Sequence, residues 1–336
     1  MIMPKLLFSL TALGQLLKEE KASSVFVVTS KTLVKTLVWA IQEIGVAENN
    51  IFLLPDGEEA KEWDRVGGLL KEFSRAGVDR QSIVVVLGGG TIGDAAGFAA
   101  SIYLRGIRYV QVPTTLVAQV DSAHGGKTGV NFEGAKNQVG AFYYPLATVI
   151  EPRFVASLKV EHIVDGLGEI IKAGFLRDPS LLEMLRAEKA ETLSRSPELT
   201  TIIKKAIDVK MFYIAQDFKD ASQRQMLNFG HTIGHAVELK HSMSHGRSVL
   251  VGMLRELYIA EQLDLTSRAV RDSLLELLTT MGVVIDTSYL VEWETVLHDK
   301  KVGGTDILWP LVTSPGTSKL ITLPLERIKP LINEYQ

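Results

Sequence analysis

An apolar run at residues 82–87, Ser-Ile-Val-Val-Val-Leu, leads directly into Gly88, Gly89 and Gly90. A short β-branched run of this kind predicts a buried strand, and the glycines predict a tight turn into a helix. Short apolar runs and stretches of helical spacing alternate at residues 24–29, 32–44, 50–55, 60–76 and 109–112. This order predicts a parallel sheet covered by helices on both faces, a Rossmann-like α/β domain.

The pattern changes near Pro152, beyond which helical spacing dominates. Helices are expected at residues 160–175, 179–193, 199–216, 222–243, 248–263 and 267–281, and a hairpin at residues 307–312 and 319–322. A chain of 336 residues is long enough for about two domains. We therefore expect an N-terminal α/β domain over residues 1–152 and a mostly α-helical C-terminal domain over residues 153–336.

The composition argues against several classes of protein. A net charge of −3 provides no global attraction to nucleic acid or to an anionic membrane. No apolar run approaches the length of about twenty residues that a membrane span needs, and the first residues do not resemble a signal peptide. We therefore expect a cytoplasmic protein. The chain has no cysteine, so any metal must be bound by His, Asp or Glu.

Two polar, glycine-containing segments suggest ligand binding. The first runs from Gly88 to Asp94, where glycines after a strand would let the backbone approach a diphosphate. It matches neither the common dinucleotide motif nor a P-loop, so a plain strand–helix turn is the alternative. The second runs from Asp121 to Asn137, is too polar for a core strand, and suits a small, charged, hydroxylated ligand.

Four of the seven histidines lie between His231 and His245. His231 and His235 are four residues apart and would share one helical face. Glu169 lies in an apolar helical stretch, one turn from Lys172, where a carboxylate needs a partner. Two or three histidines and one carboxylate form the usual catalytic zinc arrangement, and hydrogen-bonded core histidines are the alternative.

Basic residues inside and outside these segments could neutralise an anionic ligand. Each alone is more typical of a surface charge, but together they could bind a carboxylate and a phosphate. They are Arg105, Lys127, Lys136, Lys172, Lys210, Arg224, Lys300 and Lys301.

With these motifs the chain resembles the 3-dehydroquinate synthase family of sugar-phosphate cyclases. The resemblance runs from about residue 56 to residue 301, and several motifs in the same order are more specific than any one. They are Gly88-Gly-Gly-Thr-Ile-Gly-Asp94, Tyr103-Leu-Arg-Gly-Ile107, Gln111-Val-Pro-Thr-Thr-Leu-Val-Ala-Gln-Val-Asp-Ser122, Gly125-Gly-Lys-Thr-Gly-Val-Asn131, Gly134-Ala-Lys-Asn137, Glu169-Ile-Ile-Lys172 and Leu227-Asn-Phe-Gly-His-Thr-Ile-Gly-His-Ala-Val-Glu238.

The resemblance implies cofactors and site residues. A divalent metal, zinc or cobalt, would be bound by Glu169, His231 and His245. NAD would be contacted by Glu58, Lys61, Gly89, Gly90, Asp94, Thr114, Thr115, Asp121, Lys127 and Lys136. Catalysis and substrate binding would fall to Asp121, Lys127, Asn137, Lys172, Lys210, Arg224, Asn228, His235 and Lys301. Arg105 would reach the phosphate site of a neighbouring subunit, which implies a homodimer.

The implied reaction converts a phosphorylated keto acid, 3-deoxy-D-arabino-heptulosonate 7-phosphate, to 3-dehydroquinate and phosphate in the shikimate pathway. NAD is reduced and then reoxidised within one turnover. Alternatives are another sugar-phosphate cyclase of the valiolone or gadusol type, and a metal-dependent polyol dehydrogenase that consumes NAD. Three departures from the family pattern are His124, Arg247, and Ser30 at the position where the family often has an acidic residue.

Overall fold

The computed structural model describes residues 3–297 and 302–335 of the chain. The chain forms two compact units, Met1–Val155 and Ala156–Gln336. The division lies three residues after residue 152, where the sequence predicts the domain boundary. Each unit has its own sheet and its own hydrophobic core.

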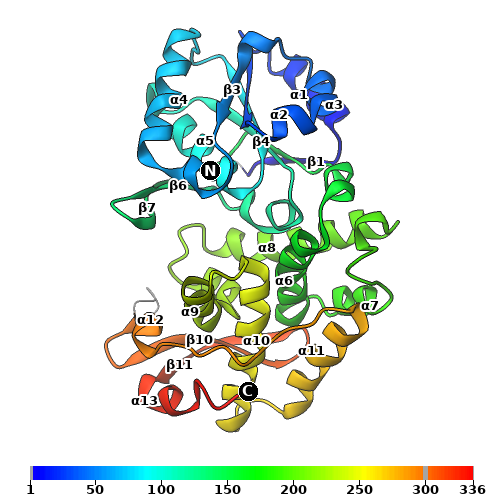
Figure 1. The fold of residues 1–336 in the computed structure, drawn as a ribbon, viewed down its shortest axis with the longest axis vertical. Helices are drawn as coiled ribbons and strands as arrows, with labels where there is room; N and C mark the ends of the chain where they lie inside the picture. The colour runs from blue at the N-terminus through cyan, green and yellow to red at the C-terminus, as the bar shows by residue number, and fades with distance from the viewer. Residues whose placement is uncertain (1–2, 298–301, 336) are drawn as a thin grey trace. The chain divides into compact units, whose positions relative to one another are not determined.

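A six-stranded parallel sheet, in the order β1-β8-β5-β4-β2-β3, forms the centre of the first unit (Figure 1). Its strands are β1 (Lys5–Leu7), β2 (Val25–Ser30), β3 (Ile51–Leu54), β4 (Ile83–Gly88), β5 (Arg108–Pro113) and β8 (Ala147–Val149). All six residues of β4 are buried, because this strand lies inside the sheet and is covered on both faces. This is the environment that its unbroken apolar run predicts.

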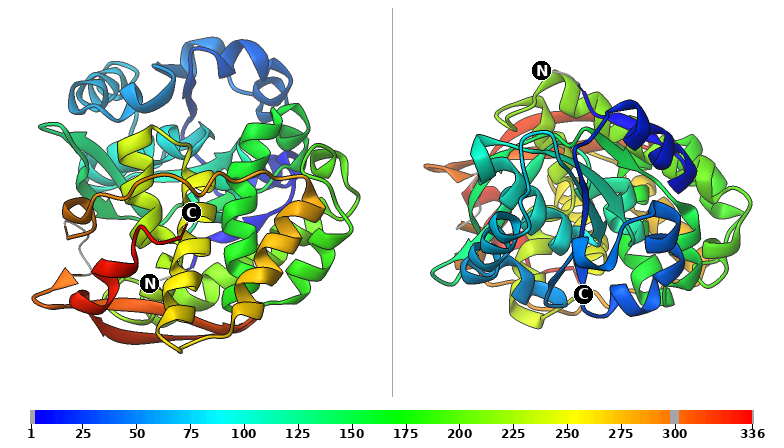
Figure 2. Two further views of the ribbon diagram at one scale, coloured as in Figure 1. Left: turned by 60° about the horizontal axis from the view of Figure 1, so that its bottom comes forward. Right: turned by 90° about the horizontal axis from the view of Figure 1, so that it is seen from above.

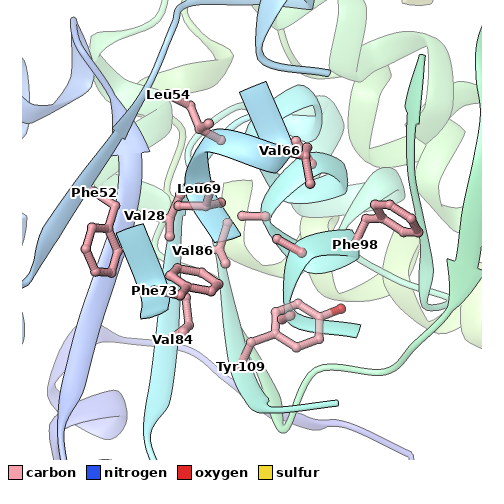
Figure 3. Packing of buried hydrophobic residues seen from close by; sticks show 14 of the residues in the cluster. Val28, Phe52, Leu54, Val66, Leu69, Phe73, Val84, Val86, Phe98 and Tyr109 are labelled. Atoms are coloured by element: carbon pink, nitrogen blue, oxygen red, sulfur yellow. The ribbon is translucent and has the colours of Figure 1, made fainter. Parts of the chain in front are cut away.

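Helices cover both faces of this sheet. They are α1 (Leu10–Glu19), α2 (Leu33–Thr36), α3 (Val38–Ile44), α4 (Trp63–Arg75) and α5 (Gly90–Ile102), with short turns of helix at Glu48–Asn50, Gly57–Lys61, Tyr103–Arg105 and Ala118–Ser122. Figure 3 shows the core of one face, in which Val84 and Val86 of β4 lie beside Phe73 of α4, and Phe98 of α5 belongs to the same cluster. The other core joins the opposite sides of the same strands to α1 and α3. The predicted Rossmann-like architecture is confirmed.

An antiparallel hairpin, β6 (Lys127–Phe132) and β7 (Ala135–Phe142), projects from this unit. The prediction that this polar segment is no core strand is wrong for Thr128 to Asn131, which are buried. The polar side chains are tolerated there because they are hydrogen-bonded. The Thr128 hydroxyl donates to the Ala141 carbonyl at 2.9 Å, and the Asn131 amide donates to Glu58 at 2.8 Å.

The second unit is mostly helical, as predicted (Figure 2). Its helices are α6 (Val160–Leu176), α7 (Ser180–Arg186), α8 (Leu199–Gln216), α9 (His231–His241), α10 (His245–Gln262), α11 (Arg268–Met281), α12 (Trp293–Leu297) and α13 (Leu325–Ile328), with short turns at Leu193–Arg195, Gln223–Asn228 and Lys329–Leu331; a further turn, Pro152–Ser157, spans the division. A small sheet contains β9 (Val302–Gly303), β10 (Asp306–Ser314) and β11 (Thr317–Pro324). The last two strands form the predicted hairpin.

Several predicted helix ends are wrong for physical reasons. The helix expected at residues 222–243 is interrupted by Gly230, whose φ of 80° lies in the left-handed region, and α9 begins only at His231. The helix expected at residues 179–193 ends at Arg186, and the Ala190 amide instead donates to the carbonyl of Met281. The helix expected at residues 32–44 is broken at Leu37, which has φ −112° and ψ 36°.

Candidate active site

Three helices of the second unit bring a carboxylate and two imidazoles together. Glu169 is buried in α6, His231 is the first residue of α9, and His245 is the first residue of α10. The Oε1 atom of Glu169 lies 3.5 Å from Nε2 of His231 and 3.3 Å from Nε2 of His245. The structure thus unites the three residues that the sequence predicts as metal ligands.

Close packing of the α6 and α10 backbones brings Glu169 and His245 together. Gly168, next to Glu169, lies against Gly246, next to His245, so a Cβ added at Gly168 would be 2.6 Å from the Gly246 carbonyl oxygen. Because neither glycine has a side chain, α6 and α10 approach until their backbones touch. The two neighbouring ligands therefore face each other across the contact.

Each imidazole is oriented through its second ring nitrogen. Nδ1 of His231 lies 3.2 Å from the Phe229 carbonyl oxygen, and Nδ1 of His245 lies 3.0 Å from Oε2 of Glu238. A hydrogen on Nδ1 leaves the lone pair on Nε2, on the side of Glu169. Histidines that bind metals are usually held in this way by a carbonyl or a carboxylate.

The donor set fits a tetrahedral divalent metal. Two ligands at about 2.0–2.1 Å from zinc in tetrahedral geometry are about 3.3 Å apart. The separations of 3.3 and 3.5 Å match this distance, whereas a charge-assisted hydrogen bond is usually about 2.7–2.9 Å long. The three residues are therefore spaced as ligands of a shared ion.

The groups of this cluster shift one another's pKa values strongly when no metal is bound. Burial lowers the pKa of His231 to about 4, and the Lys172 ammonium adds to the effect. Burial also lowers the pKa of His245, but the carboxylates of Glu169 and Glu238 beside its two ring nitrogens outweigh burial and raise that pKa to about 10. Burial raises the pKa of Glu169, but Lys172 and the imidazoles hold it well below its usual value. Two carboxylates thus face the His245 imidazole, and a divalent cation bound there would displace the proton that they hold on this ring.

Other predicted residues lie elsewhere in the second unit, on α6, α8, α9 and the short helix Gln223–Asn228. Lys172, buried in α6, pairs with Glu169, and the His235 ring is 5.1 Å from the His231 ring between centroids. Lys210 is buried in α8, while Arg224 and Asn228 lie in the short helix after it, where Arg224 donates to the Phe218 carbonyl at 2.8 Å. Lys300 and Lys301 lie outside the described residues.

In the first unit, the glycine turn connects β4 to α5 without room for side chains. A Cβ at Gly90 would be 2.8 Å from the Ser122 hydroxyl oxygen, and one at Gly88 would be 2.6 Å from Cβ of Ile92. The amide of Thr114, at the end of β5, donates to the Gly88 carbonyl at 3.0 Å, so Thr114 and Thr115 lie beside the turn. The exposed backbone at a helix N-terminus is suited to a diphosphate.

A hydrogen-bonded network joins predicted residues from three segments of the first unit. Lys61 is 5% exposed, pairs with Asp94 at 2.9 Å, and also contacts the side-chain carbonyl of Asn137. Asn131 accepts from the Asn137 amide at 3.1 Å and donates to Glu58. The turn after β3, the start of α5 and the hairpin are thereby joined.

The remaining predicted residues of this unit are more exposed. Lys127 and Lys136 lie on the hairpin, and Asp121 lies in a π-turn, a conformation frequent at functional sites. Arg105 has a φ of 66° and follows Leu104 at 49°, so two consecutive non-glycine residues adopt the left-handed region. Strain of this kind usually marks a functional position.

The three residues expected to depart from the family pattern each make a hydrogen-bond contact with the backbone. His124 is buried, and its Nε2 lies 2.7 Å from the Gln119 carbonyl oxygen. Arg247 is near the surface and donates to the Val284 carbonyl at 3.3 Å. Ser30 accepts from the Leu33 amide at 3.2 Å at the end of β2.

Sequence reasoning missed the role of Glu238 and Ser122. Glu238 lies inside a recognised motif, seven residues before His245, but its contact with that imidazole depends on the turn between α9 and α10. Ser122 follows Asp121, and its hydroxyl faces the glycine turn. Both residues lie inside quoted motifs, but nothing in the sequence shows which groups their side chains contact.

The fold and the site together define a class: a nucleotide-binding α/β unit followed by a helical unit with a glutamate–histidine metal site. Two family models match adjacent parts of the chain, the 3-dehydroquinate synthase N-terminal region over residues 51–165 and its C-terminal region over residues 166–302. The chain belongs to the 3-dehydroquinate synthase family.

Individual relatives support this family assignment. The chain is 37% identical over 300 residues to the 3-dehydroquinate synthase of Dictyoglomus turgidum, covering 87% of this chain and 84% of the relative. It is 36% identical over 334 residues to that of Clostridium kluyveri, covering 95% and 91%. A crystal structure of 2-deoxy-scyllo-inosose synthase with carbaglucose-6-phosphate, NAD+ and Co2+ has a TM-score of 0.84 at 25% identity, covering 98% and 96%. The predictions of an enzyme and of 3-dehydroquinate synthase activity are confirmed.

Among the described residues, none of the helices combines the length and apolarity needed to cross a membrane.

Proposed function

We propose that the chain carries out this reaction with NAD in the first unit and a divalent metal, zinc or cobalt, in the second. The substrate is 3-deoxy-D-arabino-heptulosonate 7-phosphate, and the products are 3-dehydroquinate and phosphate. When bound, NAD would accept and return a hydride, and the metal would polarise the carbinol oxygen. The observation that carries the proposal is the convergence of Glu169, His231 and His245, with both imidazoles oriented through Nδ1.

The residues of the second unit have distinct proposed roles. Glu169, His231 and His245 hold the metal. Lys172 keeps Glu169 ionised by its contact with that carboxylate, and His235, beside His231, moves a proton to or from the substrate. Lys210 and Arg224 are cations for the substrate carboxylate, and the Asn228 amide binds a hydroxyl.

The residues of the first unit bind cofactor and phosphate in this proposal. The glycine turn with Thr114 and Thr115 holds the diphosphate of NAD. The network of Glu58, Lys61 and Asp94 fixes the segments that line the cofactor. Lys127, Lys136 and Asn137 stabilise the phosphate as its C–O bond breaks, since charge develops on the leaving group. Asp121 accepts a hydrogen bond from a substrate hydroxyl.

We also propose a cytoplasmic homodimer in which Arg105 reaches the phosphate site of the neighbouring copy. Supporting this, Arg105 is exposed, Leu104 and Arg105 both have left-handed backbone, and the apolar side chains of Ile102 and Leu104 nearby in the sequence are also exposed. Light scattering of the purified protein tests the dimer. Arg105→Ala should lower phosphate release without changing NAD affinity. A monomeric wild-type protein would contradict the dimer, and a fully active Arg105→Ala protein would contradict the role of Arg105.

The test of the reaction is incubation with the heptulosonate phosphate, NAD and Zn2+ or Co2+, with phosphate and dehydroquinate measured. Both products should form in equal amounts without net NADH. Accumulating NADH would instead indicate a polyol dehydrogenase, and turnover of sedoheptulose 7-phosphate alone would indicate a cyclase of the valiolone type. Lys210 and Arg224, both basic, favour the carboxylate-bearing substrate.

Matched variants test the metal ligands. His245→Ala should abolish activity together with metal content. His241→Ala is the control, because His241 is at the far end of α9 and its Nε2 lies 3.1 Å from the Leu290 carbonyl oxygen. Full activity of a metal-free His245→Ala protein would refute the metal assignment.

A further inference from the structure

Glu256 is a buried carboxylate that contacts the start of the histidine helix. It lies in α10 with 1% exposure. Its Oε2 accepts from the Gly230 amide at 2.8 Å, and its Oε1 accepts from the amides of Thr232 and Ile233 at 3.1 and 3.4 Å. These three amides flank His231, so the carboxylate is bonded to the backbone on both sides of a metal ligand.

The contact has a clear physical basis. The first amides of a helix have no partner within the helix and carry a partial positive charge, which a carboxylate satisfies. A buried carboxylate is costly unless it is hydrogen-bonded, and these three bonds compensate it. Its position is set by Gly252, one turn before Glu256, where a Cβ would be 1.8 Å from the Gly230 carbonyl oxygen. The two helices therefore touch at the point where α9 begins.

We propose that Glu256 is a positioning residue for the metal site, an inference that rests on the proposed function. Helix α10 begins with one ligand, His245, and eleven residues further it holds the backbone around the second ligand, His231. One rigid helix thereby sets the separation of the two imidazoles. Without the carboxylate, the first turn of α9 is free to fray, and Nε2 of His231 leaves its place 3.5 Å from Glu169.

The substitution Glu256→Gln tests the role with little change of volume. The glutamine oxygen can accept from Thr232 and Ile233, but its NH2 group would then face the Gly230 amide, placing two donors at the present 2.8 Å contact. We expect Kd for Zn2+ or Co2+ to rise by about 10–100-fold, the usual effect of losing a group that orients a ligand. The visible spectrum of bound Co2+ should also change. Glu256→Asp keeps the charge with a shorter reach and should give a smaller effect in the same direction.

The matched control is Glu151→Gln in the first unit. Glu151 is also buried, and its Oε2 accepts from the Leu10 amide, the first of α1, at 3.3 Å. This variant should lower Tm while leaving Kd for the metal and the Co2+ spectrum unchanged. Kd for NAD should be unchanged in the Glu256 variants.

The outcomes separate this inference from the proposed function. If Glu256→Gln lowers Tm as Glu151→Gln does but binds Co2+ with the wild-type Kd and spectrum, Glu256 is merely structural and the inference is overturned. If the wild-type protein itself binds neither Zn2+ nor Co2+, it is the metal assignment of the proposed function that fails.

Discussion

Replacing Gly246 with alanine should separate two metal ligands. A Cβ at this position would lie 2.1 Å from the carbonyl oxygen of Asp165 and 2.3 Å from its Cα. Both are backbone atoms of α6, so no side-chain rotation can relieve the clash. The helix that begins with His245 must move away from the helix that carries Glu169.

The size of the effect follows from these contacts. Restoring an ordinary contact requires a shift of about 1 Å, and overpacking of this kind costs about 1–3 kcal/mol of the free energy of unfolding. The same shift acts on the 3.3 Å separation between Nε2 of His245 and Oε1 of Glu169. Metal–ligand distances tolerate deviations of about 0.2 Å, so we expect metal affinity to fall at least about tenfold.

Urea denaturation of the metal-free protein measures the first effect, and titration with Co2+ against a competing chelator measures the second. Gly14→Ala in α1 is the control, because a Cβ there would meet nothing within 4 Å. That variant should be more stable by about 0.5–1 kcal/mol, since alanine favours a helix over glycine. A Gly246→Ala protein with wild-type stability and metal affinity would refute the argument that this backbone contact positions the ligands.

Three further predictions concern the cofactor, the metal and pH. Lys61→Met removes the ammonium that pairs with Asp94. We expect this variant to bind NAD about tenfold more weakly in a fluorescence titration, with its metal content unchanged. Unaltered NAD affinity would contradict the placement of the cofactor. Dialysis against a chelator should lower Tm, and Zn2+ at about a hundred times its Kd should restore about 2.7 kcal/mol; superimposable melting curves would count against the metal site. Burial raises the pKa of Glu151, but hydrogen bonds from Arg153 and Leu10 outweigh it and hold that pKa below its usual 4.5. The ionised Glu151 therefore stabilises the fold above about pH 4.5, and this stabilisation is lost as the pH falls through the lower folded-state pKa. Glu151→Gln should lower the free energy of unfolding at about pH 7 and lower it much less at about pH 3. An equal loss at both pH values would disprove this role of Glu151.

Much of the architecture could be predicted because its signals are local. The buried strand β4 and the glycine turn after it are encoded within about ten residues, and so is the spacing that puts His231 and His235 on one helical face. The helix ends were less predictable. Gly230 interrupts an otherwise continuous helical pattern, and only the packing of α10 against it explains why the chain takes a left-handed conformation there.

Residue types and local spacing therefore determined the class of both units and a cluster of histidines with Glu169, since both depend on side-chain chemistry and short-range periodicity. The family resemblance selected His231 and His245 from that cluster. Tertiary structure alone decided the contacts that make these residues a site. Glu169 and His245 are 76 positions apart, as are Lys61 and Asn137, and Glu256 and Gly230 are 26 apart. Such contacts depend on how closely two backbones approach each other. Gly168, Gly246 and Gly252 permit this close approach, but the sequence does not show which backbone each glycine meets.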